Sequence, residues 1–121
     1  MRNFLVVDDN VAFAENLAEI IVDTETGEAK VAASGAEALE WIRTTSFDAL
    51  VTDMRMPKMS GAELIRQARL VDPGLPIVVI SAFSVEEQLA TVAHAGVLSV
   101  LPKPAPIARV LELIGRARRG G

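Results

Sequence analysis

Acidic, hydroxyl and amine side chains stand where aliphatic runs of this sequence end, and together they could bind a phosphoryl group and a metal ion. Asp8 and Asp9 directly follow the first such run, and Asp53 follows the third. Ser81 ends the fourth run, and Lys103 lies just beyond the fifth. If the runs are parallel strands of one sheet, these side chains meet at the edge formed by the carboxyl ends of the strands.

Three carboxylates at one edge require a cation. Two carboxylates about 4 Å apart repel by about 4 kcal/mol at an effective dielectric constant near 20. Lys103 supplies one positive charge, and a divalent ion would supply two. The chain has no cysteine and one histidine, so an oxygen-ligated Mg²⁺ fits better than Zn²⁺. Without metal, we expect at least one carboxyl group with a raised pKa.

Each of these residues also has an ordinary structural explanation. Asp9 or Asn10 would suit the N-cap of the first helix, Asp53 alone is a common type of loop residue, and Lys103 alone would be an exposed lysine. Their joint placement at four strand ends favours the functional interpretation.

The elements that must position these residues alternate regularly along the chain. Five aliphatic runs without polar alternation are typical of strands buried on both faces. They occupy residues 4–7, 29–33, 48–52, 77–81 and 97–101. Stretches with apolar residues three and four apart separate the runs and predict amphipathic helices. The pattern predicts a doubly wound α/β fold with a five-stranded parallel sheet and right-handed crossovers.

Residues typical of helix starts and ends agree with this division of the chain. Ser34 and Ser60 are predicted to cap the second and third helices, and Ser84 the fourth through a capping box. Gly96 suits the positive φ that often ends a helix, and Pro106 suits the first turn of the fifth helix.

Composition predicts one globular domain over residues 1–121. Half of the residues are hydrophobic, 23% are charged and the net charge is −4. We therefore expect neither direct nucleic-acid binding nor membrane binding, and the lack of cysteine excludes disulfides and thiol catalysis. No leader segment or apolar run of spanning length is visible, so we expect a soluble, cytoplasmic protein.

Four stretches in register resemble the receiver domain of bacterial two-component response regulators. They are "VVDDN", "ALVTDMRMPKMSGAELI", "PIVVISAF" and "AGVLSVLPKP". The resemblance covers residues 3–117 and implies a flavodoxin-like (βα)5 fold with strand order 2-1-3-4-5. It also implies a switch operated by phosphorylation.

The resemblance gives each site residue a role. Asp53 corresponds to the phosphoacceptor, which receives a phosphoryl group from a donor phosphohistidine. Asp9, Asp53 and the backbone carbonyl of Arg55 would bind Mg²⁺ directly, with Asp8 acting through water. Lys103 would pair with the acceptor carboxylate and later with a phosphoryl oxygen.

The remaining site expectations concern the surroundings of the phosphoryl group. Ser81 occupies the position of the hydroxyl that binds the phosphoryl group after transfer. Backbone amides near Arg55 and Ala82 are expected to complete the cradle. Gly61 would permit a close backbone approach, and the Lys103-Pro104 bond is one that the family usually has in the cis form.

Departures from the family pattern concern the output face, which comprises the fourth helix, fifth strand and fifth helix. Val100 stands where the family generally has Tyr or Phe, so no aromatic side chain can swing inward there. Ala105 stands where Phe is frequent. One hypothesis is that Leu98 and Val100 bind an apolar partner. Phe83 is expected to shield the acyl phosphate from water and to slow autodephosphorylation.

The expected partner is a sensor histidine kinase or phosphotransfer protein. For the chain itself, one interpretation is a single-domain regulator, and the other is a receiver followed by an effector domain C-terminal to residue 121. A homodimer through the output face is a further expectation. The resemblance implies that the chain is not an enzyme and that it assists only its own phosphorylation and dephosphorylation. Two alternatives are a small aspartyl-phosphate phosphohydrolase and a non-phosphorylated docking module. In the phosphohydrolase the acidic pair would fall on Asp8 and Asn10, where the second acid is missing.

Overall fold

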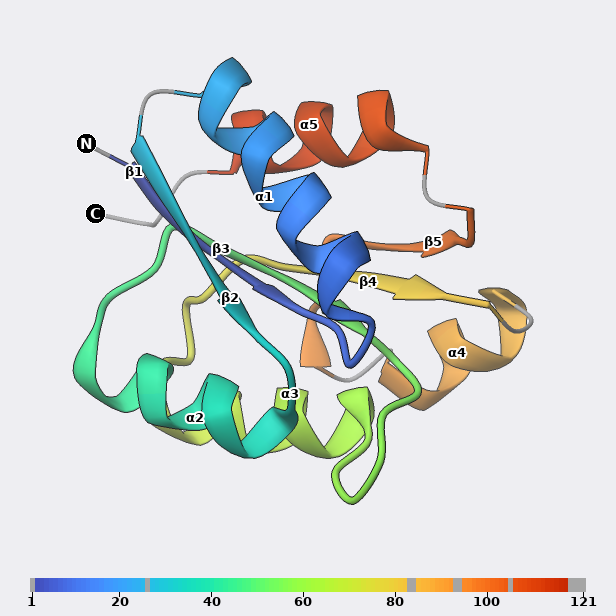
Figure 1. Cartoon of the computed structure of the whole chain (residues 1–121). Coiled ribbons are helices and arrows are strands. Elements are labelled where there is room, and N and C mark those ends of the chain that lie inside the picture. Colours follow the sequence, from blue (N-terminus) through green and yellow to red (C-terminus); the bar gives the residue numbers. More distant parts are fainter. Residues whose placement is uncertain (1, 26, 83–84, 93–94, 105, 118–121) are drawn as a thin grey trace.

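The residues that the structure describes form five strands, and a helix follows each one (Figure 1). The structure is a computed structural model that describes residues 2–25, 27–82, 85–92, 95–104 and 106–117. The strands are β1 (Arg2–Val7), β2 (Gly27–Ala32), β3 (Ala49–Asp53), β4 (Ile77–Ser81) and β5 (Ser99–Pro102). The helices are α1 (Val11–Thr24), α2 (Gly35–Thr44), α3 (Gly61–Val71), α4 (Val85–Val92) and α5 (Ile107–Arg116).

All neighbouring strands are parallel, and their order is β2-β1-β3-β4-β5. The predicted doubly wound, flavodoxin-like fold is therefore confirmed. The chain winds from β1 to β2 in one direction and returns past β1 to β3. The point at which strand order reverses lies between β1 and β3, where open α/β sheets of this type bind ligands.

Two apolar cores cover the two faces of the sheet. α1 and α5 lie on one face, and α2 and α3 lie on the other (Figure 1). In β1, Phe4 and Val6 belong to the core under α1 and α5, whereas Leu5 and Val7 belong to the opposite core. All four side chains are buried, which explains why β1 is uniformly apolar in sequence.

The helix caps agree closely with the sequence. The Ser34 hydroxyl accepts a hydrogen bond from the Glu37 backbone N–H at 3.2 Å, and Ser60 makes the same contact with Glu63. Gly96 has the predicted positive φ, at +66°. Pro106 is the N-cap of α5, one residue before the first helical turn in which it was predicted. Ser84 lies outside the described residues.

β5 corrects one expectation about the output face. Val100 is only 4% exposed and lies in the core under α2, α3 and α4, while Leu101 lies in the core under α1 and α5. Because both faces of β5 are covered, the hypothesis that Val100 contacts a partner is wrong. Leu98 precedes the strand and is 44% exposed.

No helix in the described part of the chain combines the length and the apolarity needed to cross a membrane.

Candidate functional site

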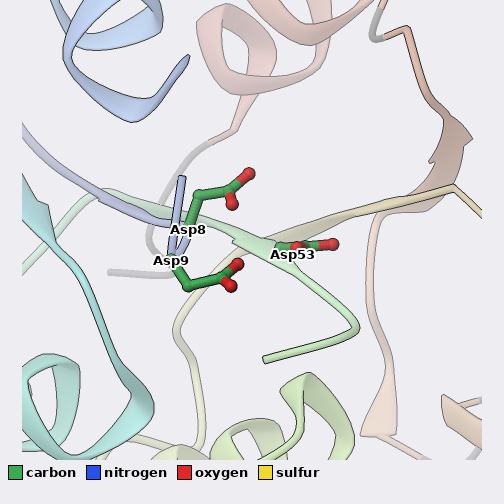
Figure 2. Close-up of side chains that lie close together, drawn as sticks. All are labelled: Asp8, Asp9 and Asp53. Atoms are coloured by element: carbon green, nitrogen blue, oxygen red, sulfur yellow. The ribbon is translucent and has the colours of Figure 1, made fainter. Parts of the chain in front are cut away.

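Three carboxyl groups gather at the carboxyl ends of β1 and β3. One ligand oxygen from each of Asp8, Asp9 and Asp53 lies within 4.8 Å of the other two, and the three carboxylates point in a similar direction (Figure 2). The register that pairs Val7 with Thr52 sets Asp8 opposite Asp53. Asp8 and Asp53 are 2% and 6% exposed, while Asp9 is exposed.

The residues after β1 divide two roles between Asp9 and Asn10. The Asn10 backbone N–H donates to Asp8 Oδ1 at 2.9 Å, and the Asn10 side chain accepts from the Phe13 backbone N–H at 3.2 Å. Asn10 is therefore the N-cap of α1. Of the two alternatives for this cap, Asn10 is the correct one, and Asp9 contributes its carboxylate to the acidic cluster instead.

Lys103 brings the positive charge to this cluster from the loop after β5. Its ammonium nitrogen lies 2.9 Å from Asp8 Oδ2 and 3.3 Å from Asp53 Oδ2. Its backbone N–H donates to the Ser81 carbonyl at 2.8 Å, and the Lys103-Pro104 bond is cis. Burial alone would lower the pKa of Lys103, but the hydrogen bond to Asp8 and the two carboxylate charges outweigh it and raise that pKa.

Asp53 is harder to ionise than a free aspartate. Burial raises the pKa of its carboxyl group, and the negative charge of Asp8 raises it further. Lys103 and the Arg55 backbone N–H, which lies 3.4 Å from Asp53 Oδ1, offset this only in part. The predicted carboxyl group with a raised pKa is thereby confirmed and assigned to Asp53.

The donor set fits a hard divalent cation. Three carboxylate oxygens lie close enough to share one ion. The single positive charge of the Lys103 ammonium group does not neutralise three carboxylates. Mg²⁺ prefers such oxygen ligands and retains water in its remaining positions. Because Asp9 is exposed while Asp8 and Asp53 are buried, an ion can reach the cluster from the Asp9 side.

The other expected residues surround Asp53. Ser81 is 1% exposed at the end of β4, the strand beside β3, and the register pairs Ile80 with Asp53. Gly61 is confirmed as a close-approach position, because an added Cβ atom would lie 2.4 Å from the Asp53 carbonyl oxygen. Phe83 and Ala105 lie outside the described residues.

One contact of the site was missed from sequence. The Lys103 ammonium nitrogen lies 5.1 Å from the centre of the Phe13 ring, within the range of a cation–π interaction. The apolar spacing around Phe13 predicts only that it lies on the buried face of the first helix. The available signal was its position three residues after the capping Asn10, which places it in the first turn of α1 at the sheet edge.

The sequence matches the family model described as the response regulator receiver domain over residues 4–115. It is 50% identical over 113 residues to a response regulator receiver protein from an Anaeromyxobacter species, covering 93% of this chain and 47% of that protein. It is 40% identical over 115 residues to the response regulator MprA of Mycobacterium ulcerans, covering 94% and 47%. The chain thus spans about half the length of these relatives.

The fold is also similar to solved receiver structures. A response regulator receiver protein from Pseudomonas putida superposes with a TM-score of 0.88 at 32% identity, and the match covers 95% of this chain and 96% of the other.

Proposed function

The chain belongs to the response regulator receiver domain family, and on this premise we propose that it is a phosphorylation switch whose phosphoacceptor is Asp53. Receiver domains are signalling modules of two-component systems. The observation that carries the proposal is the buried Asp53 carboxylate, which faces two further aspartates and the Lys103 ammonium group at the switch point of the sheet.

In the proposed reaction an oxygen of Asp53 attacks the phosphorus atom of a phosphohistidine. The P–N bond breaks as the new O–P bond forms, the electron pair stays on the imidazole, and Asp53 becomes an acyl phosphate. The transition state of such transfers is loose, so positioning and charge neutralisation matter more than covalent assistance. Lys103 is suited to bind a phosphoryl oxygen, and the Ser81 hydroxyl to hold another after transfer.

We assign Asp9, Asp53 and the Arg55 backbone carbonyl as direct Mg²⁺ ligands and Asp8 as a ligand through water. When bound, the ion would neutralise charge on the phosphoryl oxygens and orient them. The charge imbalance of the cluster supports this assignment, because Lys103 is the only cation within ion-pair distance of Asp8 and Asp53 among the described residues.

The phosphohydrolase alternative is less well supported. It needs a second acid two residues after Asp8, and the residue there is Asn10, whose side chain is engaged as the α1 cap. The docking-module alternative leaves the clustered aspartates and Lys103 without a use. We propose that the chain assists only its own phosphorylation and dephosphorylation.

We propose that residues 1–121 are one receiver domain that exchanges phosphoryl groups with a sensor histidine kinase or phosphotransfer protein. The relatives are about twice as long, which supports an effector domain after residue 121. A homodimer through α4, β5 and α5 is a further proposal, and the exposed Leu98 beside β5 is available for it. We assign no direct nucleic-acid or membrane contact to residues 1–121.

Incubation with acetyl phosphate and Mg²⁺ tests the proposal. The switch predicts one added phosphoryl group, located on Asp53 by peptide mapping. Turnover of many phosphoesters would instead support a phosphohydrolase, and no reaction at all would support a docking module.

A further inference from the structure

Phe13 connects, through a side-chain contact, the start of α1 with the loop after β5. It lies in the first turn of α1, and its ring centre is 5.1 Å from the ammonium nitrogen of Lys103, which comes from the loop after β5. We infer that Phe13 is a positioning residue, which holds the Lys103 ammonium group beside Asp53 for phosphoryl transfer. The inference rests on the proposed function of the site.

The contact closes a ring of four residues. Asp8 accepts from the Asn10 backbone N–H, and Asn10 in turn accepts from the Phe13 backbone N–H. The Phe13 ring contacts the Lys103 ammonium group, which donates to Asp8 at 2.9 Å. The segment from Asp8 to the first turn of α1 therefore contacts the lysine twice, through a carboxylate and through an aromatic ring.

Lys103 needs such support because it reaches across the sheet. The order β1-β3-β4-β5 places its strand two positions from Asp53 and three from Asp8. Its side chain must therefore extend past the neighbouring strand β4 to contact Asp53 and Asp8. A flexible four-carbon stem ordered over this span loses considerable rotamer freedom. Contacts at its end determine where the charge lies.

An aromatic ring suits this role better than another acid. The ring attracts the cation through its electron-rich face and carries no carboxylate to compete strongly for the ammonium N–H groups. Those groups point to Asp8 and Asp53 in this structure. They remain available to a phosphoryl oxygen when Asp53 carries one, while the ring contact persists.

The packing of Phe13 allows this role to be separated from stability. Phe13 is half-buried, and it also packs against the core under α1 and α5. Phe13→Leu keeps an apolar side chain there but removes the aromatic face, whereas Phe13→Tyr keeps both. Trp41→Leu is a matched control, because half-buried Trp41 makes a similar contact with Lys30 at 5.5 Å from the opposite side of the sheet.

The first readout is the rate at which Asp53 is phosphorylated by acetyl phosphate with Mg²⁺. We expect Phe13→Leu to slow it about 3- to 10-fold, the loss implied by one cation–π contact. Phe13→Tyr should restore most of the rate, and Trp41→Leu should not change it. Equal rates for wild type and Phe13→Leu would overturn the inference, as would equal losses in Phe13→Leu and Phe13→Tyr.

The second readout needs no phosphorylation. The chain has three lysines, Lys30, Lys58 and Lys103, so NMR resolves three ε-methylene signals in the full chain. We expect ring-current shifts for Lys30 and Lys103 and none for the exposed Lys58. Phe13→Leu should move only the Lys103 signal to the unshifted position, and Trp41→Leu only that of Lys30.

A Lys103 signal that is unshifted in the wild type would overturn the inference by itself. If the wild type takes no phosphoryl group at Asp53, the proposed function fails. The shift of Lys103 then still decides whether Phe13 positions the lysine.

Discussion

β1 has a cation at each end, and the two ends are built differently. At the amino end, the Arg2 guanidinium donates to Glu25 at 2.9 Å and to the carbonyls of Ile114, Gly115 and Ala117 at the end of α5. One positive charge meets one carboxylate, and backbone acceptors take the other donors. At the carboxyl end, the single ammonium group of Lys103 faces a cluster of three carboxylates.

The difference separates a structural contact from a site that needs a ligand. The Arg2 cluster is matched in charge and ties together β1, the end of α1 and the end of α5. The acidic cluster stays negative until a further cation arrives. A fold stabilised at one end of a strand can thus carry a charge imbalance at the other.

The largest expected effect is loss of Asp53 phosphorylation at the carboxyl end of β1, which we call the unbalanced end because its carboxylates outnumber its cation. Asp53→Asn should reduce phosphoryl incorporation from acetyl phosphate to background, because the amide is no nucleophile. Asp23→Asn, which removes an exposed acid near the far end of α1, should leave the incorporation measured by mass spectrometry unchanged. Incorporation at an undiminished level in Asp53→Asn would show that another residue is the acceptor.

Arg2→Ala tests the amino end of β1, where the charges are balanced. Hydrogen bonds to charged groups contribute about 1.5–3 kcal/mol, so removing the guanidinium should lower the free energy of unfolding by about 2–3 kcal/mol. Hydrogen exchange should become faster at the end of α5. Phosphorylation of Asp53 should remain, since the two ends of β1 are separate.

Arg43→Ala is the control for this change, because Arg43 makes an exposed ion pair with Glu40. Removing it should cost less than about 1 kcal/mol in urea unfolding. Equal effects of the two arginine substitutions would contradict the role assigned to Arg2.

Mg²⁺ should stabilise the chain through the unbalanced end. At a free Mg²⁺ concentration ten times the dissociation constant, binding to the folded state alone adds about 1.4 kcal/mol. Thermal unfolding with increasing Mg²⁺ measures this gain. Asp9→Asn should abolish it, whereas Glu63→Gln, which alters an acid paired with Arg66 on α3, should preserve it.

The smallest effect concerns metal-free protein at neutral pH. The pKa of Asp53 is raised above its ordinary value of 3.8. The stability that this carboxyl group contributes is therefore fully present below pH 3.8 and is lost as the pH rises through the raised pKa of the folded state. Asp53→Asn should therefore increase the free energy of unfolding at pH 7 by on the order of 1 kcal/mol. The gain should vanish in acid, and an equal gain at every pH would contradict the charge explanation.

Much of the fold could be predicted because its signals are local. Uninterrupted aliphatic runs marked the strands, and Ser34 and Ser60 marked two helix starts where the structure has them. The strand-end positions of Asp53 and Lys103 also predicted that they meet, since parallel strands end at one edge.

What could not be predicted depends on distant packing. Arg2 bonds to Ala117, which is 115 positions away in the sequence. The contact of Phe13 with Lys103 arises only because the sheet order brings two loops together. The burial of Val100, by contrast, agrees with its uninterrupted apolar run, and only the hypothesis that Val100 contacts a partner was wrong.

Anomalous diffraction from crystals containing Mn²⁺ tests most directly whether the unbalanced end is a cation site. Mn²⁺ prefers the same oxygen ligands as Mg²⁺ and is visible by its anomalous signal. We predict one peak bound by the carboxylates of Asp9 and Asp53 together with the Arg55 carbonyl. A peak elsewhere, or none at saturating Mn²⁺, would contradict the account.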